Sequence, residues 1–179
     1  MGNIIKILVV LFLCSGGTLT VKDSFAKKVK RKVVVVKHKR YKKYPAKGAV
    51  VVNVGNSKTI KHKNVVYYRS NGIYYRKYAK GYKVVSAPLG YKIKVLPSKH
   101  VRIVIQGRPY FYHYGTYYVM NSNEYEVVLP PVGARVDDLP EGYELLNLDG
   151  KTYFIVDGVY YKKVFINNGD VVFEVVKTA

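Results

Sequence analysis

The chain repeats itself with a period of 43 residues, and this repeat restricts its possible folds more than any other feature. When residues 64–97 are laid over residues 107–140, 11 of the 34 positions are identical without a gap. A repeat of this length indicates supersecondary units that stack on one another and share a core. Three units are therefore predicted, which we call unit 1 (residues 48–89), unit 2 (residues 90–132) and unit 3 (residues 133–179).

The residues within each unit are those typical of β-strands. Val, Ile and Tyr dominate the apolar runs, and no run has the 3.6-residue period of an amphipathic helix. Asn71-Gly72 and Asp157-Gly158 predict two-residue hairpin turns, because Asn, Asp and Gly tolerate the positive φ that such turns need. Further predicted turns are Tyr114-Gly115, Asp149-Gly150, Gln106-Gly107 and Lys63-Asn64. The sequence thus predicts an all-β fold of three tandem meanders, each with about four short strands.

The first hairpin of unit 1 assigns the side chains to two faces. With Asn71-Gly72 as the turn, Tyr68 lies opposite Tyr75 and Arg69 lies opposite Tyr74. The predicted core face carries Val66, Tyr68, Ile73, Tyr75, Phe111, Tyr118, Phe154, Val156, Val159 and Tyr161. The other face, which we call the tyrosine ladder, carries Tyr67, Arg69, Tyr74, Arg76, Tyr110, Tyr112, Tyr117, Tyr153, Ile155 and Tyr160, and it is predicted to be at least partly exposed to water.

The tyrosine ladder is the candidate ligand-binding surface. Tyrosines interleaved with arginines can stack on sugar rings or bases and donate hydrogen bonds from their edges. The candidate contacts are Tyr67, Arg69, Tyr74, Arg76, Tyr110, Tyr112, Tyr117, Tyr153 and Tyr160. The alternative is that the paired tyrosines only stabilise neighbouring strands, with both faces buried between sheets. The sequence leaves both interpretations open.

The N-terminus has the pattern of a secretory signal peptide. Lys6 precedes an apolar run at residues 7–13, and Ser24-Phe25-Ala26 places small residues at a cleavage site after Ala26. Cleavage after Gly17 is an alternative. The apolar run is shorter than the roughly 20 residues that span a bilayer, so no transmembrane helix is expected in the mature chain. The predicted location is periplasmic or extracellular, and removal of residues 1–26 also removes Cys14, the single cysteine.

Positive charge is concentrated in the first half of the chain. The formal net charge is +20, and no Asp or Glu occurs between Ser24 and Asn123. Residues 27–47 form a basic arm that is predicted to be poorly ordered because its like charges repel, although Val33–Val36 could pair as an edge strand. Its candidate polyanion contacts are Lys30, Arg31, Lys32, Lys37, Lys39, Arg40, Lys42 and Lys43.

Such a positive field attracts polyanions and steers them over long distances. The expected partners are an envelope polymer, an anionic lipid or glycan surface, or another envelope protein. Nucleic acid is expected to bind only without sequence specificity.

The sequence predicts no catalytic, metal or cofactor site. It contains no glycine-rich phosphate loop, nucleophile elbow or metal-binding helix motif. The four histidines have no acid nearby in sequence, and the acids of units 2 and 3 lack calcium-loop spacing. The histidines are His38, His62, His100 and His113, and the clustered acids are Glu124, Glu126, Asp137, Asp138, Glu141 and Glu144. A hydrolase would need a cleft in which a histidine meets one of these acids, so a non-enzymatic protein is expected.

The repeated pattern also resembles a known family. Glycine, proline and tyrosine recur in fixed order at Gly107–Tyr118, Tyr125–Pro140 and Gly142-Tyr143, with echoes at Gly48-Ala49-Val50 and Gly158-Val159-Tyr160-Tyr161. In this the chain resembles an uncharacterised family of exported bacterial envelope proteins, known only as a domain of unknown function. The resemblance implies export and an envelope location without a known activity. The chain departs from the pattern in its lysine-rich arm and in Lys63-Asn64, which replaces a glycine turn.

Together these features predict an exported, non-enzymatic structural or interaction module of the cell envelope. The alternative function is polyanion or glycan binding through the basic arm and the tyrosine ladder.

Overall fold

The computed structural model describes residues 32–34, 40, 41, 43–167 and 169–178, with only the backbone for residues 32–34. The predicted signal peptide and much of the basic arm lie outside these residues. Every regular element in the described part is a β-strand. None of its segments is a helix long and apolar enough to cross a membrane.

Each unit forms its own antiparallel sheet, so the predicted all-β fold with three tandem meanders is confirmed. Unit 1 has β3 (Lys58–His62), β4 (Val65–Ser70), β5 (Ile73–Tyr78) and β6 (Gly81–Val85). Unit 2 has β8 (Val101–Ile105), β9 (Arg108–His113), β10 (Thr116–Asn121) and β11 (Glu124–Val128). Unit 3 has β13 (Tyr143–Leu148), β14 (Lys151–Val156), β15 (Val159–Phe165) and β16 (Val171–Lys177).

The hairpin turns lie where the sequence predicts them. Asn71 and Gly72 have φ angles of 50° and 77°, and Asp157 and Gly158 have 50° and 82°. The resulting register pairs Tyr68 with Tyr75, as expected. Positive φ at both central residues suits the twist of the flanking strands, which is why these dipeptides end the strands at fixed positions.

Each sheet has an additional short strand that the sequence interpretation missed. These strands are β2 (Val50–Val51), β7 (Lys92–Ile93) and β12 (Arg135–Val136), and each pairs with the last strand of its own meander. The dipeptide that opens the unit supports the pairing: the Gly48 amide donates to the Val84 carbonyl, and the Val84 amide donates to the Ala49 carbonyl. The chain therefore returns to its own sheet before the meander begins.

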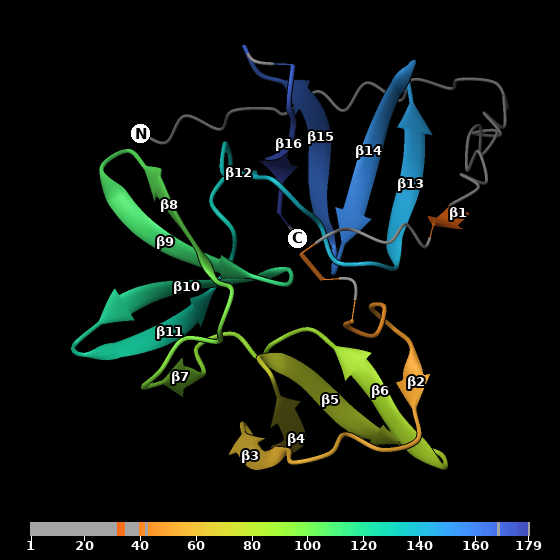
Figure 1. The fold of residues 1–179 in the computed structure, drawn as a ribbon, viewed down its shortest axis with the longest axis vertical. Helices are drawn as coiled ribbons and strands as arrows, with labels where there is room; N and C mark the ends of the chain where they lie inside the picture. The colour runs from red at the N-terminus through yellow and green to blue at the C-terminus, as the bar shows by residue number, and fades with distance from the viewer. Residues whose placement is uncertain (1–31, 35–39, 42, 168, 179) are drawn as a thin grey trace, which may run out of the picture.

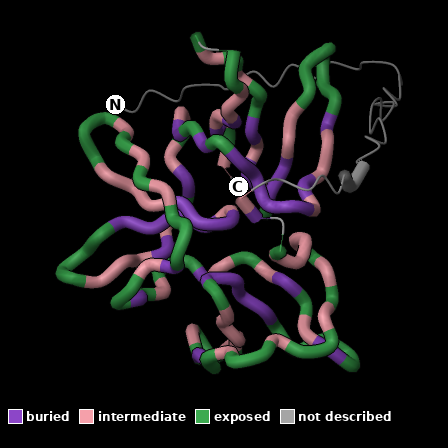
Figure 2. Tube along the Cα trace, in the orientation of Figure 1, coloured by how far each residue is buried: buried purple, intermediate pink, exposed green. Residues whose placement is uncertain are grey.

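The three sheets extend outwards from a shared centre (Figure 1). Buried residues gather at that centre, whereas the outer hairpin tips are exposed (Figure 2). The main core cluster draws on all three units and includes Ile73 and Tyr75 of unit 1, Tyr112 and Tyr117 of unit 2, and Tyr161 of unit 3. Stability therefore depends on packing between units, as expected for repeats too small to bury a core alone.

Some residues of the basic arm contact the folded units. The backbone of β1 (Lys32–Val34) pairs with β13 and extends the sheet of unit 3, so the first half of the Val33–Val36 run forms the edge strand that was considered. Further along, Tyr41 is 1% exposed and belongs to the main core. Burial of a tyrosine ring offsets the repulsion among the lysines that surround it in sequence.

The tyrosine ladder is buried at some positions and accessible at others. Tyr74, Tyr112 and Tyr117 are each at most 1% exposed, so the prediction of exposure is wrong at these positions. In unit 2 the predicted core-face residue Tyr118 is also buried, in a second cluster with Ile93 and Val127. Both faces of this sheet are covered because units 1 and 3 pack on opposite sides of it, as the contacts below show.

Candidate functional site: the open junction between units 1 and 3

Tyrosine pairs join successive units. The Tyr74 hydroxyl of unit 1 lies 3.5 Å from the Tyr118 hydroxyl of unit 2. The Tyr161 hydroxyl of unit 3 donates to the Tyr117 hydroxyl of unit 2 at 3.4 Å. Burial raises the pKa of all four phenols, so each remains a neutral hydroxyl.

A proline of each following unit covers the hairpin turn of the unit before it. A Cβ added at Gly72 would lie 2.5 Å from Pro97 Cβ and 2.7 Å from His113 Cε1. One added at Gly115 would lie 3.3 Å from Pro140 Cγ. Pro97 and Pro140 each follow a leucine at the same place in units 2 and 3, so the Leu-Pro step seals both junctions.

The junction between units 3 and 1 has a different sequence, and no tyrosine pair joins these units within the described residues. Asn53-Val54 stands where units 2 and 3 have Leu-Pro. Tyr160, which corresponds to Tyr74 and Tyr117, packs against Tyr153 at 6.5 Å between ring centroids. In the described part of the chain Tyr160 makes no hydrogen bond to Tyr75. We call this place, where the described residues form neither the tyrosine pair nor a Leu-Pro step, the open junction; it lies between the sheets of units 1 and 3 (Figure 1).

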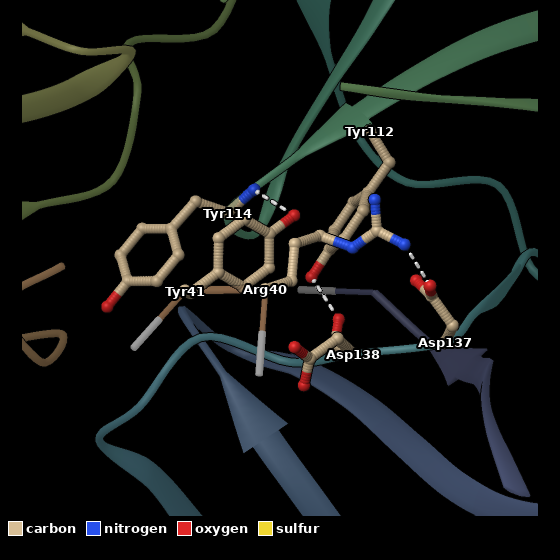
Figure 3. A network of polar contacts seen from close by, with 6 residues as sticks. All are labelled: Arg40, Tyr41, Tyr112, Tyr114, Asp137 and Asp138. Atoms are coloured by element: carbon tan, nitrogen blue, oxygen red, sulfur yellow. Dashed lines mark hydrogen bonds and ion pairs between the residues drawn. The ribbon is translucent and has the colours of Figure 1, made fainter. Parts of the chain in front are cut away.

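Residues 40–47, without residue 42, lie at this open junction, and we call them the docked segment. Figure 3 shows Arg40 and Tyr41 between the hairpin end of unit 2 and the aspartates of unit 3. Arg40 pairs with Asp137, and the Tyr114 amide donates to the Tyr41 hydroxyl at 3.1 Å. Burial raises the pKa of Tyr41 to about 12.

The rest of the docked segment is held equally closely. The Tyr114 hydroxyl donates to the Pro45 carbonyl at 2.7 Å, and the Lys47 ammonium lies 2.7 Å from Asp157 Oδ2. The Lys47 amide donates to the Glu141 carbonyl at 2.8 Å. These contacts connect the docked segment to units 2 and 3 and leave its other side facing unit 1.

A cavity of about 830 Å³ lies between the docked segment and unit 1. It exists partly because unit 1 has the small residues Ser70 and Asn71 where unit 2 has His113 and Tyr114. Its lining residues are Lys43, Tyr44, Pro45, Ala46, Val51, Asn53, Val54, Gly55, Asn56, Ser70, Asn71, Ile73, Tyr75 and Glu141. The volume lies within the range of small-molecule sites, about 300–1,000 Å³.

Glu141 is the acidic residue of this cavity. It is 6% exposed, and its Oε1 atom is buried with no hydrogen-bond partner among the described residues. A buried carboxylate without a partner is costly, because neither water nor protein replaces its hydration. The sequence interpretation grouped Glu141 with the other acids and missed its role, although its counterpart in unit 2 is the uncharged Ser98.

The predicted ladder residues fall into two groups. Tyr74, Tyr112 and Tyr117 hold units together and are inaccessible. The more accessible group consists of exposed Arg76 and partly buried Tyr67, Arg69, Tyr110, Tyr153 and Tyr160. Tyrosine and arginine share a sheet face in unit 1, at Tyr67, Arg69 and Arg76, and in unit 2, where the Arg108 guanidinium lies 5.6 Å from the centroid of the Tyr110 ring.

The predicted polyanion contacts are only partly described. Arg40 forms an ion pair with Asp137, and the exposed residue Lys43 lines the cavity. Lys32 is placed in β1 by its backbone alone. Lys30, Arg31, Lys37, Lys39 and Lys42 lie outside the described residues.

Histidines and acids do not form a metal cluster within the described residues. His113 is fully buried, its ring nitrogens have no partner in the described structure, and burial lowers its pKa to about 4. His100 donates from Nδ1 to the Pro97 carbonyl at 2.9 Å. His62 packs against Tyr91 with ring centroids 5.9 Å apart. His38 lies outside the described residues.

Comparison with known proteins identifies a family. No curated protein and no solved structure matches the chain. The family match includes residues 31–47, in agreement with the packing of the docked segment into the fold. On the strength of a match over residues 31–179, the chain belongs to a family of unknown function, DUF6515.

Proposed function

We propose that the protein is an exported, non-enzymatic interaction module of the cell envelope that holds anionic envelope polymers on the ladder face of unit 1. The observation that carries this proposal is the pairing of Arg76 directly with Lys83 across β5 and β6. Like charges directly opposite one another destabilise a strand pair. An anionic partner would convert this unfavourable arrangement into two favourable contacts.

Unit 1 has no acid of its own to neutralise these charges. Within the described residues, none of the ion pairs includes a residue of unit 1. In unit 3, by contrast, Glu174 pairs with Arg135 at 2.7 Å and with Lys162 at 2.8 Å, and these hydrogen bonds lower its pKa. Unit 1 is therefore the most positively charged of the three units, which favours its orientation towards a polyanion.

Exposed aromatic surface accompanies the charge. Tyr78 is 54% exposed, and the Lys83 ammonium lies 5.5 Å from the centroid of its ring. Tyr78 follows Arg76 by two residues on β5 and so shares its face. A ring beside two cations suits a polymer that has both sugar rings and negative groups.

The envelope location rests on the N-terminal sequence. Lys6, the apolar run at residues 7–13 and the small residues before Lys27 fit a signal peptide that is removed on export. A chain without cysteine after residue 26 is compatible with an oxidising compartment.

Paired substitutions test the anionic-polymer site. Arg76→Gln with Lys83→Gln removes two charges from unit 1, and Lys151→Gln with Lys177→Gln removes two exposed charges from unit 3 as the matched control. Binding to lipopolysaccharide is measured over a salt series. We expect the unit 1 variant to lose at least about tenfold in affinity and to show a shallower salt dependence. Equal losses in the two variants would reject a specific site on unit 1.

The contribution of the basic arm is tested separately. Deletion of residues 27–39 removes most of the arm but keeps the docked segment, whose Tyr41 belongs to the core. If lipopolysaccharide binding depends on the arm alone, this deletion will abolish it, while the Arg76 and Lys83 variant will bind normally.

A second candidate function is contact with other protein chains. β3 and β8 lie at the edges of their sheets, where backbone groups are free to pair with another strand. Val104 on β8 is 48% exposed. Sedimentation velocity of the mature protein tests this function: concentration-dependent association that Val104→Lys suppresses would support it, and a monomer at all concentrations would reject it.

A further inference from the structure

We infer that the cavity at the open junction binds a protonated primary amine flanked by hydroxyl groups, as in an amino sugar, with Glu141 as the counter-charge. This site is separate from the anionic-polymer face of unit 1, because it requires a ligand of opposite charge and uses none of Arg76, Tyr78 or Lys83.

The first argument is the carboxylate itself. The protein carries a large positive charge, yet the one acid lining this cavity is 6% exposed and has an oxygen without a partner among the described residues. An ionised carboxylate can only accept hydrogen bonds, so it needs a donor that bears positive charge. Glu141 lines the cavity, so a donor bound there can approach its carboxylate.

The second argument is that none of the described cations pairs with Glu141. The Lys47 ammonium is 2.7 Å from Asp157 and 5.6 Å from the Tyr114 ring centroid. Lys43 lines the cavity but is exposed, and it forms no ion pair with Glu141 in the described structure. The charge on Glu141 is therefore available to a ligand.

The third argument is the remainder of the lining. Tyr44 and Tyr75 supply two aromatic rings, which attract ammonium groups and the C–H faces of sugars. The amides of Asn53, Asn56 and Asn71 and the Ser70 hydroxyl can donate to and accept from ligand hydroxyls. A simple alkylamine would make no hydrogen bonds to these polar groups, so the lining favours a polyhydroxylated amine.

The sequence of unit 1 at this junction explains why a polar cavity lies here. Pro97 and Pro140 cover the hairpin turns of units 1 and 2, and Tyr-Tyr pairs join those units to their successors. At this junction Asn53-Val54 replaces the Leu-Pro step, and both residues line the cavity. Asn53 thus stands where the other units have leucine, and Val54 stands where they have the proline that covers the turn.

Calorimetric titration of the mature protein tests the inference. The probes are glucosamine hydrochloride, N-acetylglucosamine, glucose and lysine amide. Glucosamine is expected to bind at least about tenfold more tightly than N-acetylglucosamine or glucose, which lack the ammonium group. Tighter binding of glucosamine than of lysine amide identifies an amino sugar as the source of the amine, whereas the reverse order identifies a peptide amine and rejects recognition of the hydroxyls.

Two variants assign the binding to this cavity. Glu141→Gln is expected to weaken glucosamine at least about tenfold, while the matched control Glu124→Gln on β11 leaves it unchanged. Asn56→Trp adds bulk to the lining and is expected to abolish binding, with thermal unfolding measured to confirm that it folds. Unchanged affinity in Glu141→Gln, equal binding of the neutral sugars, or no binding of glucosamine would each overturn the inference.

Discussion

The Tyr161 hydroxyl donates to the Tyr117 hydroxyl across the junction of units 2 and 3, and both rings are at most 1% exposed. Tyr74 and Tyr118 lie in the same relationship one unit earlier. Adjacent residues of a strand point to opposite faces, so Tyr117 faces unit 3 while Tyr118 faces unit 1. The repeated Tyr-Tyr dipeptide therefore joins each sheet to a neighbour.

Removal of both hydroxyls of this pair should cost less than the sum of the two single removals. Tyr117→Phe leaves the buried Tyr161 hydroxyl without its acceptor, and we expect a loss of about 1–3 kcal/mol in the free energy of unfolding. The double variant with Tyr161→Phe should lose less than the sum of the single variants. Urea unfolding measures all three. Tyr153→Phe, at a partly exposed ring, is the control, and strict additivity would contradict the predicted coupling.

Tyr41 should be required for the stability of the whole fold, although it lies in the basic arm. Its ring contacts Tyr114 at 4.9 Å and His113 at 5.9 Å between centroids. Tyr41→Ala should lower the free energy of unfolding by about 3–5 kcal/mol, as for other buried aromatic truncations. Tyr78→Ala, at a 54% exposed ring, should cost much less. Equal losses in chemical denaturation would show that the docked segment is not part of the core.

Gly72 and Gly107 form a matched pair for testing the sealed junction. Both have φ of +77°, but a Cβ at Gly72 would meet Pro97 at 2.5 Å, whereas nothing lies within 4 Å at Gly107. Gly107→Ala should cost about 1–2 kcal/mol from backbone strain alone. Gly72→Ala should cost a further ~1–3 kcal/mol from overpacking. The comparison is made by urea midpoints, and equal midpoints would exclude a tight contact with Pro97.

His113 should make the fold less stable in mild acid. Burial, followed by the nearby cations Arg69, His100, Lys47 and Lys99, lowers its pKa from 6.5 to about 4. The unfolded chain therefore binds a proton that the folded chain does not between these values. The neutral imidazole therefore costs no stability above pH 6.5. As the pH falls from 6.5 to about 4, the free energy of unfolding decreases by a total of about 3 kcal/mol.

His113→Phe keeps a ring against Tyr41 and removes the titrating group. Its free energy of unfolding should change less between pH 7.5 and pH 4.5 than that of the unmodified protein. The difference between the two proteins at pH 7.5 measures the effect of the substitution on packing. An identical pH dependence in both proteins would assign the acid sensitivity to other groups.

Local sequence was sufficient to predict the main strands and the hairpin turns. Positive φ at Asn71-Gly72 and Asp157-Gly158 depends on residues that are neighbours in the chain, so the hairpins and their register could be predicted. The short strands β2, β7 and β12 were missed because two residues are too few to show a periodic pattern.

Burial of the ladder could not be predicted in the same way. Tyr74 and Tyr78 lie on the same face of β5, yet Tyr74 is 1% exposed and Tyr78 is 54% exposed. The difference arises because Tyr118 of unit 2 covers only the end of the strand that carries Tyr74. The packing of one sheet on another depends on contacts between residues far apart in the chain.

By itself, the sequence determined three all-β units, because period, turn chemistry and strand propensity act over a few residues. Only the tertiary structure decided which tyrosines are buried, that the arm docks through Arg40 and Tyr41, and that Glu141 lies in a cavity at the open junction. The partner of Arg40 is 97 residues away, and no local pattern brings the two together. Long-range packing provides the burial and the counter-charges that outweigh the repulsion within the arm.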